Sequence, residues 1–240
     1  MNFQRQGLFD LPPVVKTLLI INIILFVFKM LMPELGMRLA LYSFKSDFFQ
    51  PYQLVTHMFM HGSFWHLLFN MFALYMFGKI LEDMWGPKRF LFFYFFTGLG
   101  AAAVHLLVIN IEINSLISKM NPDQIEMVLK DGSSVLLQGK NYIDASMRDL
   151  NIIINTPTVG ASGAIFGLLT AFGMAFPNAQ LQLLFPPIPI KGKYIAVVAL
   201  VIGYVMDGSG NVAHFAHLGG IIFGFIFFMF WNKWKFNRWN

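Results

Sequence analysis

Long apolar stretches separated by short polar segments dominate this sequence. Most of them approach the roughly 20 residues that a helix needs to cross a hydrocarbon core of ~30 Å. Six stretches stand out, near residues 14–33, 57–80, 90–111, 158–176, 194–206 and 213–231. The pattern predicts an all-α membrane protein, a bundle of six transmembrane helices over residues 14–231, with polar external loops.

Two short tails flank this bundle: residues 1–13 at the N-terminus and the basic residues 232–240 at the C-terminus. The first apolar stretch is expected to be a retained helix, because Lys29 follows the apolar run and no small-residue cleavage site is obvious before Pro33. If this helix spans, Lys16 and Lys29 should extend toward the two interfaces. The fifth stretch, near residues 194–206, has the shortest uninterrupted run of apolar residues.

Composition agrees with a membrane environment. Hydrophobic residues make up 57% of the chain and charged residues only 12%, against about 25% charged residues in soluble domains. The net charge is +5, but its basic residues are spread over membrane-flanking loops. We therefore expect no nucleic-acid partner. The absence of cysteine excludes disulfides, thiol nucleophiles and cysteine metal sites.

The basic residues also predict the orientation. With the N-terminus inside, the cytoplasmic segments hold 10 basic and 3 acidic residues, whereas the external segments hold 7 and 9. The positive-inside rule then places both termini in the cytoplasm. The expected location is the bacterial inner membrane, in which the chain is a multi-pass protein. Its oligomeric state stays open.

Residues 113–157 form the one long polar segment, an external loop between the third and fourth predicted helices. Residues 126–129 and 135–138 flank a turn-like run at 130–134, which is compatible with a short β-hairpin. A loop of this length without its own structure is unusual, so the segment is either a small folded cap or a flexible functional insert.

Two polar residues in apolar surroundings suggest chemistry. Ser162 lies near the start of the fourth stretch, and His217 lies near the start of the sixth. A serine in an apolar helix usually bonds back to a carbonyl one turn earlier. A nearby histidine changes this interpretation, because a base within hydrogen-bond reach activates a serine hydroxyl. The start of a helix also favours a developing oxyanion.

Small residues could bring these two side chains together. Gly163 and Gly167 share one face of the fourth helix, while His217, Gly220 and Gly224 share one face of the sixth. Small faces allow two helices to approach closely. If the helices pack in this way, the serine and the histidine come within reach, and both should lie just below the external surface.

His66 and Asn70 are four residues apart on the second predicted helix, so both can point into the same cavity. His57 and His61 show the same spacing. They could be metal or haem ligands, but hydrogen-bonded structural histidines that brace the first external loop are favoured.

Three motifs in this order resemble those of the rhomboid intramembrane serine proteases. They are Gly160-Ala161-Ser162-Gly163, the run of His57, His61, His66 and Asn70, and Ala216-His217-Leu218-Gly219-Gly220. The resemblance covers most of the chain. It implies that Ser162 is the nucleophile and His217 the general base and acid, with no acidic third member. It also implies an oxyanion hole made by His66, Asn70 and the Ser162 backbone N–H.

The resemblance further implies no metal and no cofactor, and substrates that are single-pass transmembrane proteins in the lipid bilayer. Gly160, Gly163 and His61 are expected to be structural positions near the site. Three features depart from the family pattern. Phe166 stands where many members carry a tyrosine that packs on the catalytic imidazole, Tyr52-Gln53 replaces a Trp-Arg pair in the first external loop, and the 113–157 segment is long.

Two other functions stay open at this point. The six histidines permit a haem- or metal-binding membrane protein, in which His57, His61, His66, His105, His214 and His217 would supply ligands. A chaperone-like protein that binds transmembrane helices without cleaving them is the second alternative.

Overall fold

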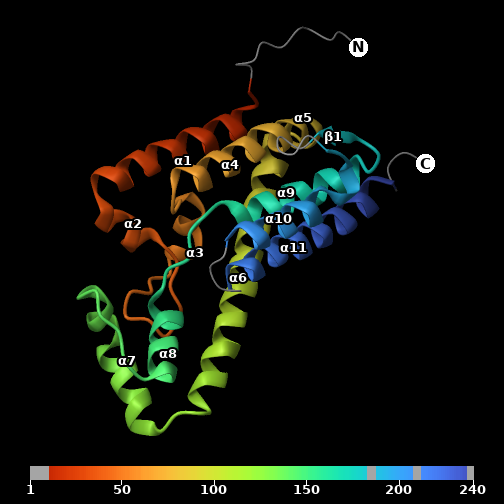
Figure 1. Ribbon diagram of the computed structural model, residues 1–240. Coiled ribbons are helices and arrows are strands. Elements are labelled where there is room, and N and C mark those ends of the chain that lie inside the picture. The colour runs from red at the N-terminus through yellow and green to blue at the C-terminus, as the bar shows by residue number, and fades with distance from the viewer. Residues whose placement is uncertain (1–10, 183–187, 208–211, 237–240) are drawn as a thin grey trace.

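The computed structural model describes residues 11–182, 188–207 and 212–236 (Figure 1). Its α-helices are α1 (Pro13–Leu31), α2 (Pro33–Leu39), α3 (Gln53–Thr56), α4 (Phe64–Ala73), α5 (Lys79–Trp85), α6 (Pro87–Ile117), α7 (Pro122–Leu137), α8 (Ala145–Asn155), α9 (Ser162–Ala175), α10 (Ile195–Asp207) and α11 (Val212–Phe236). The shorter elements are η1 (His57–Phe59) and η3 (Gly192–Tyr194), which are 3-10 turns, the π-helical turn η2 (Leu74–Gly78), and the antiparallel strands β1 (Gln180–Gln182) and β2 (Pro189–Lys191).

Each of the six predicted apolar stretches contains a helix, so the predicted helical character is confirmed. By length and composition, three described segments could cross a membrane: Pro13–Leu31, Phe64–Trp85 and Pro87–Ile117. The segments Ser162–Ala175, Gly192–Val205 and His214–Phe230 are shorter apolar helices. The second helix begins later than the apolar run does, because the Ser63 side chain caps it by accepting a hydrogen bond from the His66 N–H.

Helices α6, α9 and α11 lie side by side and form the centre of the bundle (Figure 1). Their contacts use glycines. A Cβ atom on Gly220 of α11 would collide with the Gly163 carbonyl of α9, and one on Gly224 would lie 2.9 Å from the Gly167 Cα. The predicted packing of these two glycine faces is therefore confirmed, and it brings the backbones of α9 and α11 into direct contact.

A buried carboxylate joins the start of α1 to α5, at the end of the bundle that lies away from α7 and α8 (Figure 1). Glu82 is 2% exposed, and its two oxygens accept hydrogen bonds from the backbone N–H groups of Val14 and Val15, at 2.9 and 2.7 Å. These amides belong to the first turn of α1, which has no hydrogen-bond partners within its own helix and favours negative charge. Glu82 therefore caps α1 from a different helix.

Replacing Glu82 with alanine should destabilise the fold by about 1–3 kcal/mol, because two N–H groups lose their acceptor in an apolar region. Thermal unfolding in detergent would measure the loss. Asp83→Ala is the matched control, since Asp83 is the exposed neighbour and its replacement should leave the unfolding temperature nearly unchanged. Equal shifts for the two variants would contradict the capping role.

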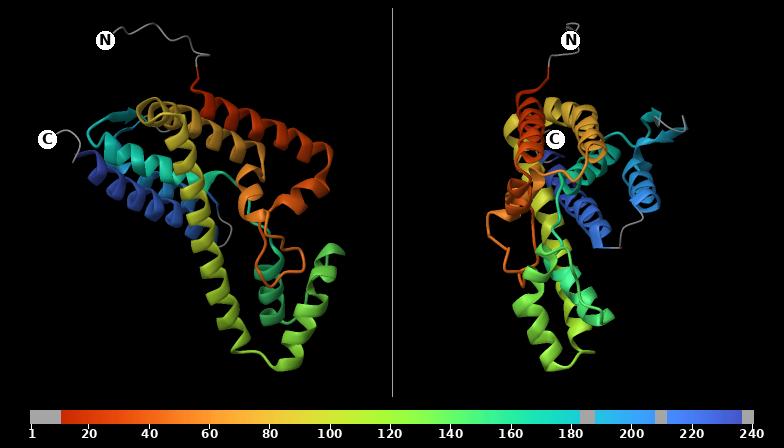
Figure 2. Two further views of the ribbon diagram at one scale, coloured as in Figure 1. Left: turned by 180° about the vertical axis from the view of Figure 1, so that it is seen from behind. Right: turned by 60° about the vertical axis from the view of Figure 1, so that its left-hand side comes forward.

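The long polar segment, residues 113–157, is a folded helical cap. Helix α6 continues beyond the bundle, α8 packs against its end, and α7 packs against α8 (Figure 2). The cap has its own hydrophobic core, formed by Ile109 and Ile113 of α6, Val128 of α7, and Leu150 and Ile154 of α8. Of the two alternatives for this segment, the folded cap is confirmed.

The short β-hairpin with which the sequence of this segment is compatible does not form, because residues 122–137 form the single helix α7. Asn121 and Gln124 make a capping box at its start, in which each side chain bonds the other residue's backbone N–H. Gly132, which suggested a turn, is buried in the middle of the helix, where a Cβ atom would overlap the Asn151 side chain. The glycine provides space for helix packing.

A chain of polar side chains links the cap to the first loop, which is the segment between α2 and α4. Ser46 donates to Asn155 Oδ1 at 2.7 Å, Asn155 donates to Asn151 Oδ1 at 2.9 Å, and Asn151 donates to Asn141 Oδ1 at 3.1 Å.

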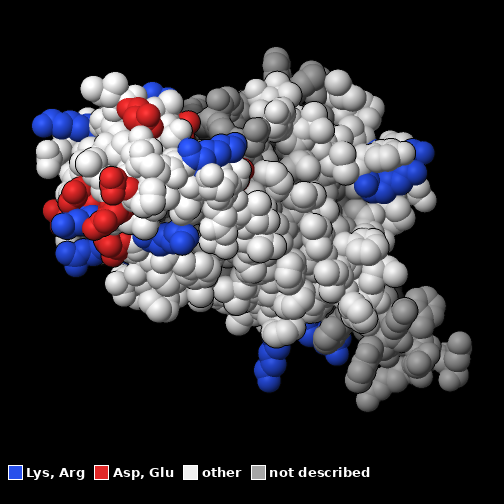
Figure 3. Space-filling view, turned by 90° about the horizontal axis from the view of Figure 1, so that it is seen from below, with Lys and Arg blue, Asp and Glu red and all other residues white. Residues whose placement is uncertain are grey.

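Charged side chains of both signs gather at one side of the face in Figure 3, beside a wide uncharged area. On the face seen in Figure 3, the cap is thus the part of the molecule that is rich in charged side chains.

Gln53 organises the first loop internally. Its side-chain nitrogen donates to the carbonyls of Arg38 and Phe48, and its oxygen accepts from the backbone N–H groups of Tyr42 and Gln50. The amide is 0% exposed and uses both its donor and its acceptor atoms. Gln53 belongs to the Tyr52-Gln53 pair that stands in place of a Trp-Arg pair, and its hydrogen bonds still hold the loop together.

Candidate active site

Ser162 is the first residue of α9. The segment before it is held by its neighbours: Thr158 pairs with Leu41 of the first loop, and the Gly160 N–H donates to the His57 carbonyl at 2.9 Å. Gly160 has a φ of 133°, in a region of backbone conformation that residues other than glycine rarely adopt. This sharp turn places the serine where the first backbone N–H groups of α9 have no partner within the helix.

The structure brings together the two residues that the sequence analysis paired. His217 of α11 lies with its Nε2 atom 2.9 Å from Ser162 Oγ. Phe166 lies one turn after Ser162, and its ring stacks on the His217 imidazole with centroids 4.4 Å apart and planes inclined by 22°. The aromatic face restricts the orientation of the imidazole, although Phe166 has no hydroxyl to bond it.

His66 approaches Ser162 from α4. A Cβ atom on Gly160 would lie 2.8 Å from His66 Nε2 and 3.4 Å from Ser162 Oγ, so the imidazole lies directly beside the Gly160–Ser162 turn. Asn70 lies one helical turn further on, is 6% exposed, and donates to the His66 carbonyl at 2.8 Å. The Asn70 amide has a second N–H group for another acceptor.

A small cavity of about 20 Å³ adjoins Ser162, which is room for about one water molecule. Its polar lining residues are His57, His105, Thr158 and Ser162, and Gly160 also lines it. His105 Nε2 is 2.6 Å from Thr158 Oγ1. This contact joins α6 to the segment that leads into Ser162.

His57 and His61 precede α4 in the first loop, outside the three segments that are long and apolar enough to cross a membrane. Burial lowers the pKa of His57 to about 4, and its Nδ1 lies 2.7 Å from the Gln53 carbonyl. Burial also lowers the pKa of His61 to about 3, and the nearby His66 and Lys29 add to that shift. Both imidazoles are therefore neutral at neutral pH. His61 packs edge-on against His66, with centroids 5.1 Å apart.

The histidine rings meet in pairs instead of surrounding one point: His61 contacts His66, and His214 contacts His217 with centroids 6.2 Å apart. His57 and His105 instead contact Gln53 and Thr158. Within residues 11–182, 188–207 and 212–236, no three His, Cys, Asp or Glu side chains lie close enough to share a metal ion. The metal-binding alternative thus has no gathered ligand set in this part of the chain.

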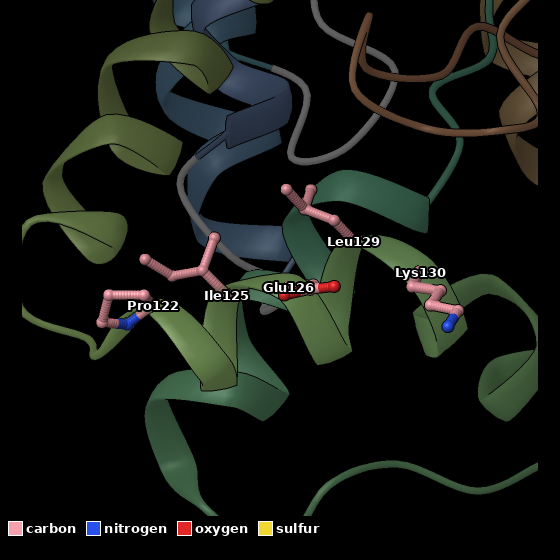
Figure 4. Close-up of a pocket in the computed structure, with 5 residues that line it drawn as sticks. All are labelled: Pro122, Ile125, Glu126, Leu129 and Lys130. Atoms are coloured by element: carbon pink, nitrogen blue, oxygen red, sulfur yellow. The ribbon is translucent and has the colours of Figure 1, made fainter.

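A larger hollow of about 510 Å³ lies on the cap (Figure 4). It is open to solvent and lined by Pro122, Ile125, Glu126, Leu129 and Lys130, all from α7. It shares no lining residue with the cavity beside Ser162. The two hollows therefore belong to different parts of the molecule.

Comparison with known families decides which proteins this chain is related to. The family model described as the Rhomboid domain matches residues 49–233, which include Ser162, His217, His66 and Asn70. This chain belongs to the rhomboid family. As a rhomboid, it is a membrane protein with apolar helices, in agreement with the hydropathy pattern.

Curated relatives include two mitochondrial rhomboids. The chain is 28% identical over 178 residues to rhomboid protein 1 of Saccharomyces cerevisiae, covering 73% of this chain and 40% of the relative. It is 28% identical over 183 residues to RHOMBOID-like protein 12 of Arabidopsis thaliana, covering 76% and 46%. This rhomboid chain therefore spans less than half the length of these two relatives.

A third relative, the chloroplastic rhomboid-like protein 11 of Arabidopsis thaliana, is 45% identical over 58 residues, covering 24% of this chain and 21% of the relative. The names of all three relatives place them in mitochondria or chloroplasts. They give no support to the expected bacterial inner membrane.

Sequence reasoning missed two contacts around this rhomboid site. The His105–Thr158 contact gave no signal, because the residues are 53 positions apart and share no motif. Lys29 was expected to extend toward an interface, but its ammonium donates to the His61 carbonyl at 2.6 Å. The sequence did hold one signal for the second contact: a lysine in the last turn of an apolar helix, whose charge needs hydrogen-bond partners.

Proposed function

We propose that this chain is an intramembrane serine protease, which hydrolyses peptide bonds in or near transmembrane segments of membrane proteins through a Ser-His dyad and an acyl-enzyme. The observation that carries the proposal is the 2.9 Å contact between His217 Nε2 and Ser162 Oγ. It occurs at the start of a helix, within an apolar bundle, in a chain of the rhomboid family.

In the first step, neutral His217 takes the proton from Ser162 as Oγ attacks the scissile carbonyl carbon. The Oγ–C bond forms and the carbonyl oxygen becomes an oxyanion. Stacking on Phe166 supports the imidazole in the orientation that this transfer requires. His217 then gives its proton to the leaving amine as the C–N bond breaks, leaving an acyl group on Ser162.

The oxyanion needs donors that are in place before the charge develops. The Ser162 backbone N–H is available at the start of α9. His66 Nε2 lies beside the Gly160–Ser162 turn, and Asn70 lies one helical turn deeper. These three donors come from two helices, so the pocket depends on how α4 sits against α9.

The second step repeats the sequence with water. His217 takes a proton from a water molecule, the resulting hydroxide attacks the acyl carbon, and Ser162 leaves with the proton from His217. The cavity of about 20 Å³ beside Ser162 could hold such a water close to the acyl group.

The proposed arrangement in the bilayer has six spans, three of them formed by the shorter helical segments. Both termini lie on the side that carries the excess of basic residues, and the cap lies on the opposite side. Ser162 is then close to the cap side, because only residues 156–161 separate it from α8. Substrates would be single-pass transmembrane proteins cleaved near that surface.

Covalent labelling tests the proposal against its alternatives. A fluorophosphonate probe added to the purified protein should modify Ser162, as located by mass spectrometry of the digest. A chaperone-like binder would retain transmembrane peptides without labelling or cleavage. A haem protein would instead show a Soret band in its absorption spectrum. Labelling at other serines but not at Ser162 would overturn the proposal.

Removing one oxyanion donor should slow the reaction without abolishing it. We expect Asn70→Ala to lower kcat by about 10²-fold with little change in KM, because the lost bond forms only in the transition state. The matched control is Asn22→Ala, since Asn22 makes the same bond to a carbonyl one turn earlier, but in α1. Similar kcat losses in the two variants would point to a general effect on folding.

A further inference from the structure

Lys29 lies in the last turn of α1, and its side chain turns toward the first loop. Its ammonium donates to the carbonyls of His61 at 2.6 Å and Gly62 at 3.2 Å. The aliphatic part lies against α2, where a Cβ atom on Gly36 would come within 2.8 Å of Lys29 Cγ. Glycine at position 36 leaves space for the lysine stem, so the side chain is held along its length.

The His61 carbonyl belongs to the peptide group whose N–H is that of Gly62. This N–H points at His66 Nδ1, at 3.5 Å. One peptide therefore connects the Lys29 ammonium on its oxygen side with the His66 imidazole on its nitrogen side. A cation at the carbonyl oxygen polarises the peptide and makes its N–H a better donor.

The contact bears on which imidazole nitrogen carries the proton. In a neutral imidazole one nitrogen accepts and the other donates. If Nδ1 accepts from Gly62, the proton is on Nε2, and Nε2 is the atom beside the Gly160–Ser162 turn. An oxyanion at Ser162 needs a donor there, so the opposite tautomer would present a lone pair to a negative charge.

We infer that Lys29 is a positioning residue for His66: through the 61–62 peptide, it holds the imidazole in place with its proton on Nε2. This inference rests on the proposed function, in which His66 is an oxyanion donor. Lys29 itself touches neither the substrate nor the reacting atoms.

Three variants test the role in the purified, reconstituted full chain. Lys29→Met keeps a stem of similar length but removes the donors, and Gly36→Ala displaces the stem while leaving the charge in place. Both should lower kcat by about tenfold to a hundredfold, the scale of a misplaced catalytic group, with KM unchanged. Lys45→Met is the control, because it removes an exposed charge from the same loop and should leave kcat unchanged.

The tautomer gives a readout that does not depend on activity. The ¹⁵N chemical shifts of the His66 imidazole, assigned by comparison with His66→Gln, should show a protonated Nε2 in wild type and a mixture of tautomers in Lys29→Met. Lys29→Arg should restore both the shifts and much of kcat, because it also donates to carbonyls.

Two results would overturn the role of Lys29: an unchanged His66 tautomer in Lys29→Met, or a rise in KM at constant kcat. If the wild type neither cleaves nor is labelled at Ser162, the proposed function fails instead. The imidazole shifts would still report whether Lys29 sets the tautomer.

Discussion

Ser162→Ala should abolish cleavage of a membrane-anchored reporter, with kcat falling on the order of 10⁶-fold. The variant has no atom that can form the acyl bond, and alanine leaves the glycine contacts of α9 and α11 intact. His217→Ala should give a loss of similar size, because Ser162 then has no base at 2.9 Å. Product formation in reconstituted vesicles would measure both losses.

The double variant separates a dyad from two independent contributions. If Ser162 and His217 act as one unit, removing both should cost little more than removing either. Ser118→Ala is the control, an exposed serine in the turn between α6 and α7, and this variant should cleave at the wild-type rate. Full activity in Ser162→Ala would refute the assignment of the nucleophile.

Gly160→Ala should reduce kcat by at least about 10²-fold, the scale of losing one oxyanion donor. The new methyl group would lie 2.8 Å from His66 Nε2 and 3.4 Å from Ser162 Oγ, so the imidazole must move away from the turn. The φ of 133° at this position adds backbone strain. Reporter cleavage and thermal unfolding of the same preparation would be compared.

Gly139→Ala isolates the contribution of strain. Gly139 also has a positive φ, of 70°, but no atom lies within 4 Å of a Cβ at this position, which is in the turn between α7 and α8. This variant should lose about 1 kcal/mol of stability and keep its activity. If Gly160→Ala cleaved as well as Gly139→Ala does, the turn at Gly160 would have no special part in the site.

The helices of the bundle and the pairing of Ser162 with His217 could be inferred from the sequence, because both depend on local patterns. Apolar runs indicate spans, and glycines three or four residues apart indicate a face that another helix can approach. The pattern at Gly163 and Gly220 contains the information needed to place α9 against α11.

The cap could not be assigned correctly in this way. Around Gly132 the local sequence suggests a turn between two strands, yet the residue lies inside α7 because Asn151 of α8 packs against it. Similarly, Lys29 bonds a carbonyl 32 residues away only because α2 and the first loop turn back toward α1. Such contacts depend on the tertiary fold, which the local sequence of a single segment does not predict.

Helix α6 has 31 residues, which corresponds to a length of about 46 Å, against ~30 Å for the hydrocarbon core. The excess carries the cap, whose polar helices cannot sink into lipid without losing their hydration. We therefore expect the cap to limit how deeply this end of the molecule enters the bilayer. Because residues 156–161 tie α8 to Ser162, bilayers of different thickness should leave the serine at a constant distance from the cap-side surface, and the opposite end of the bundle should absorb the mismatch.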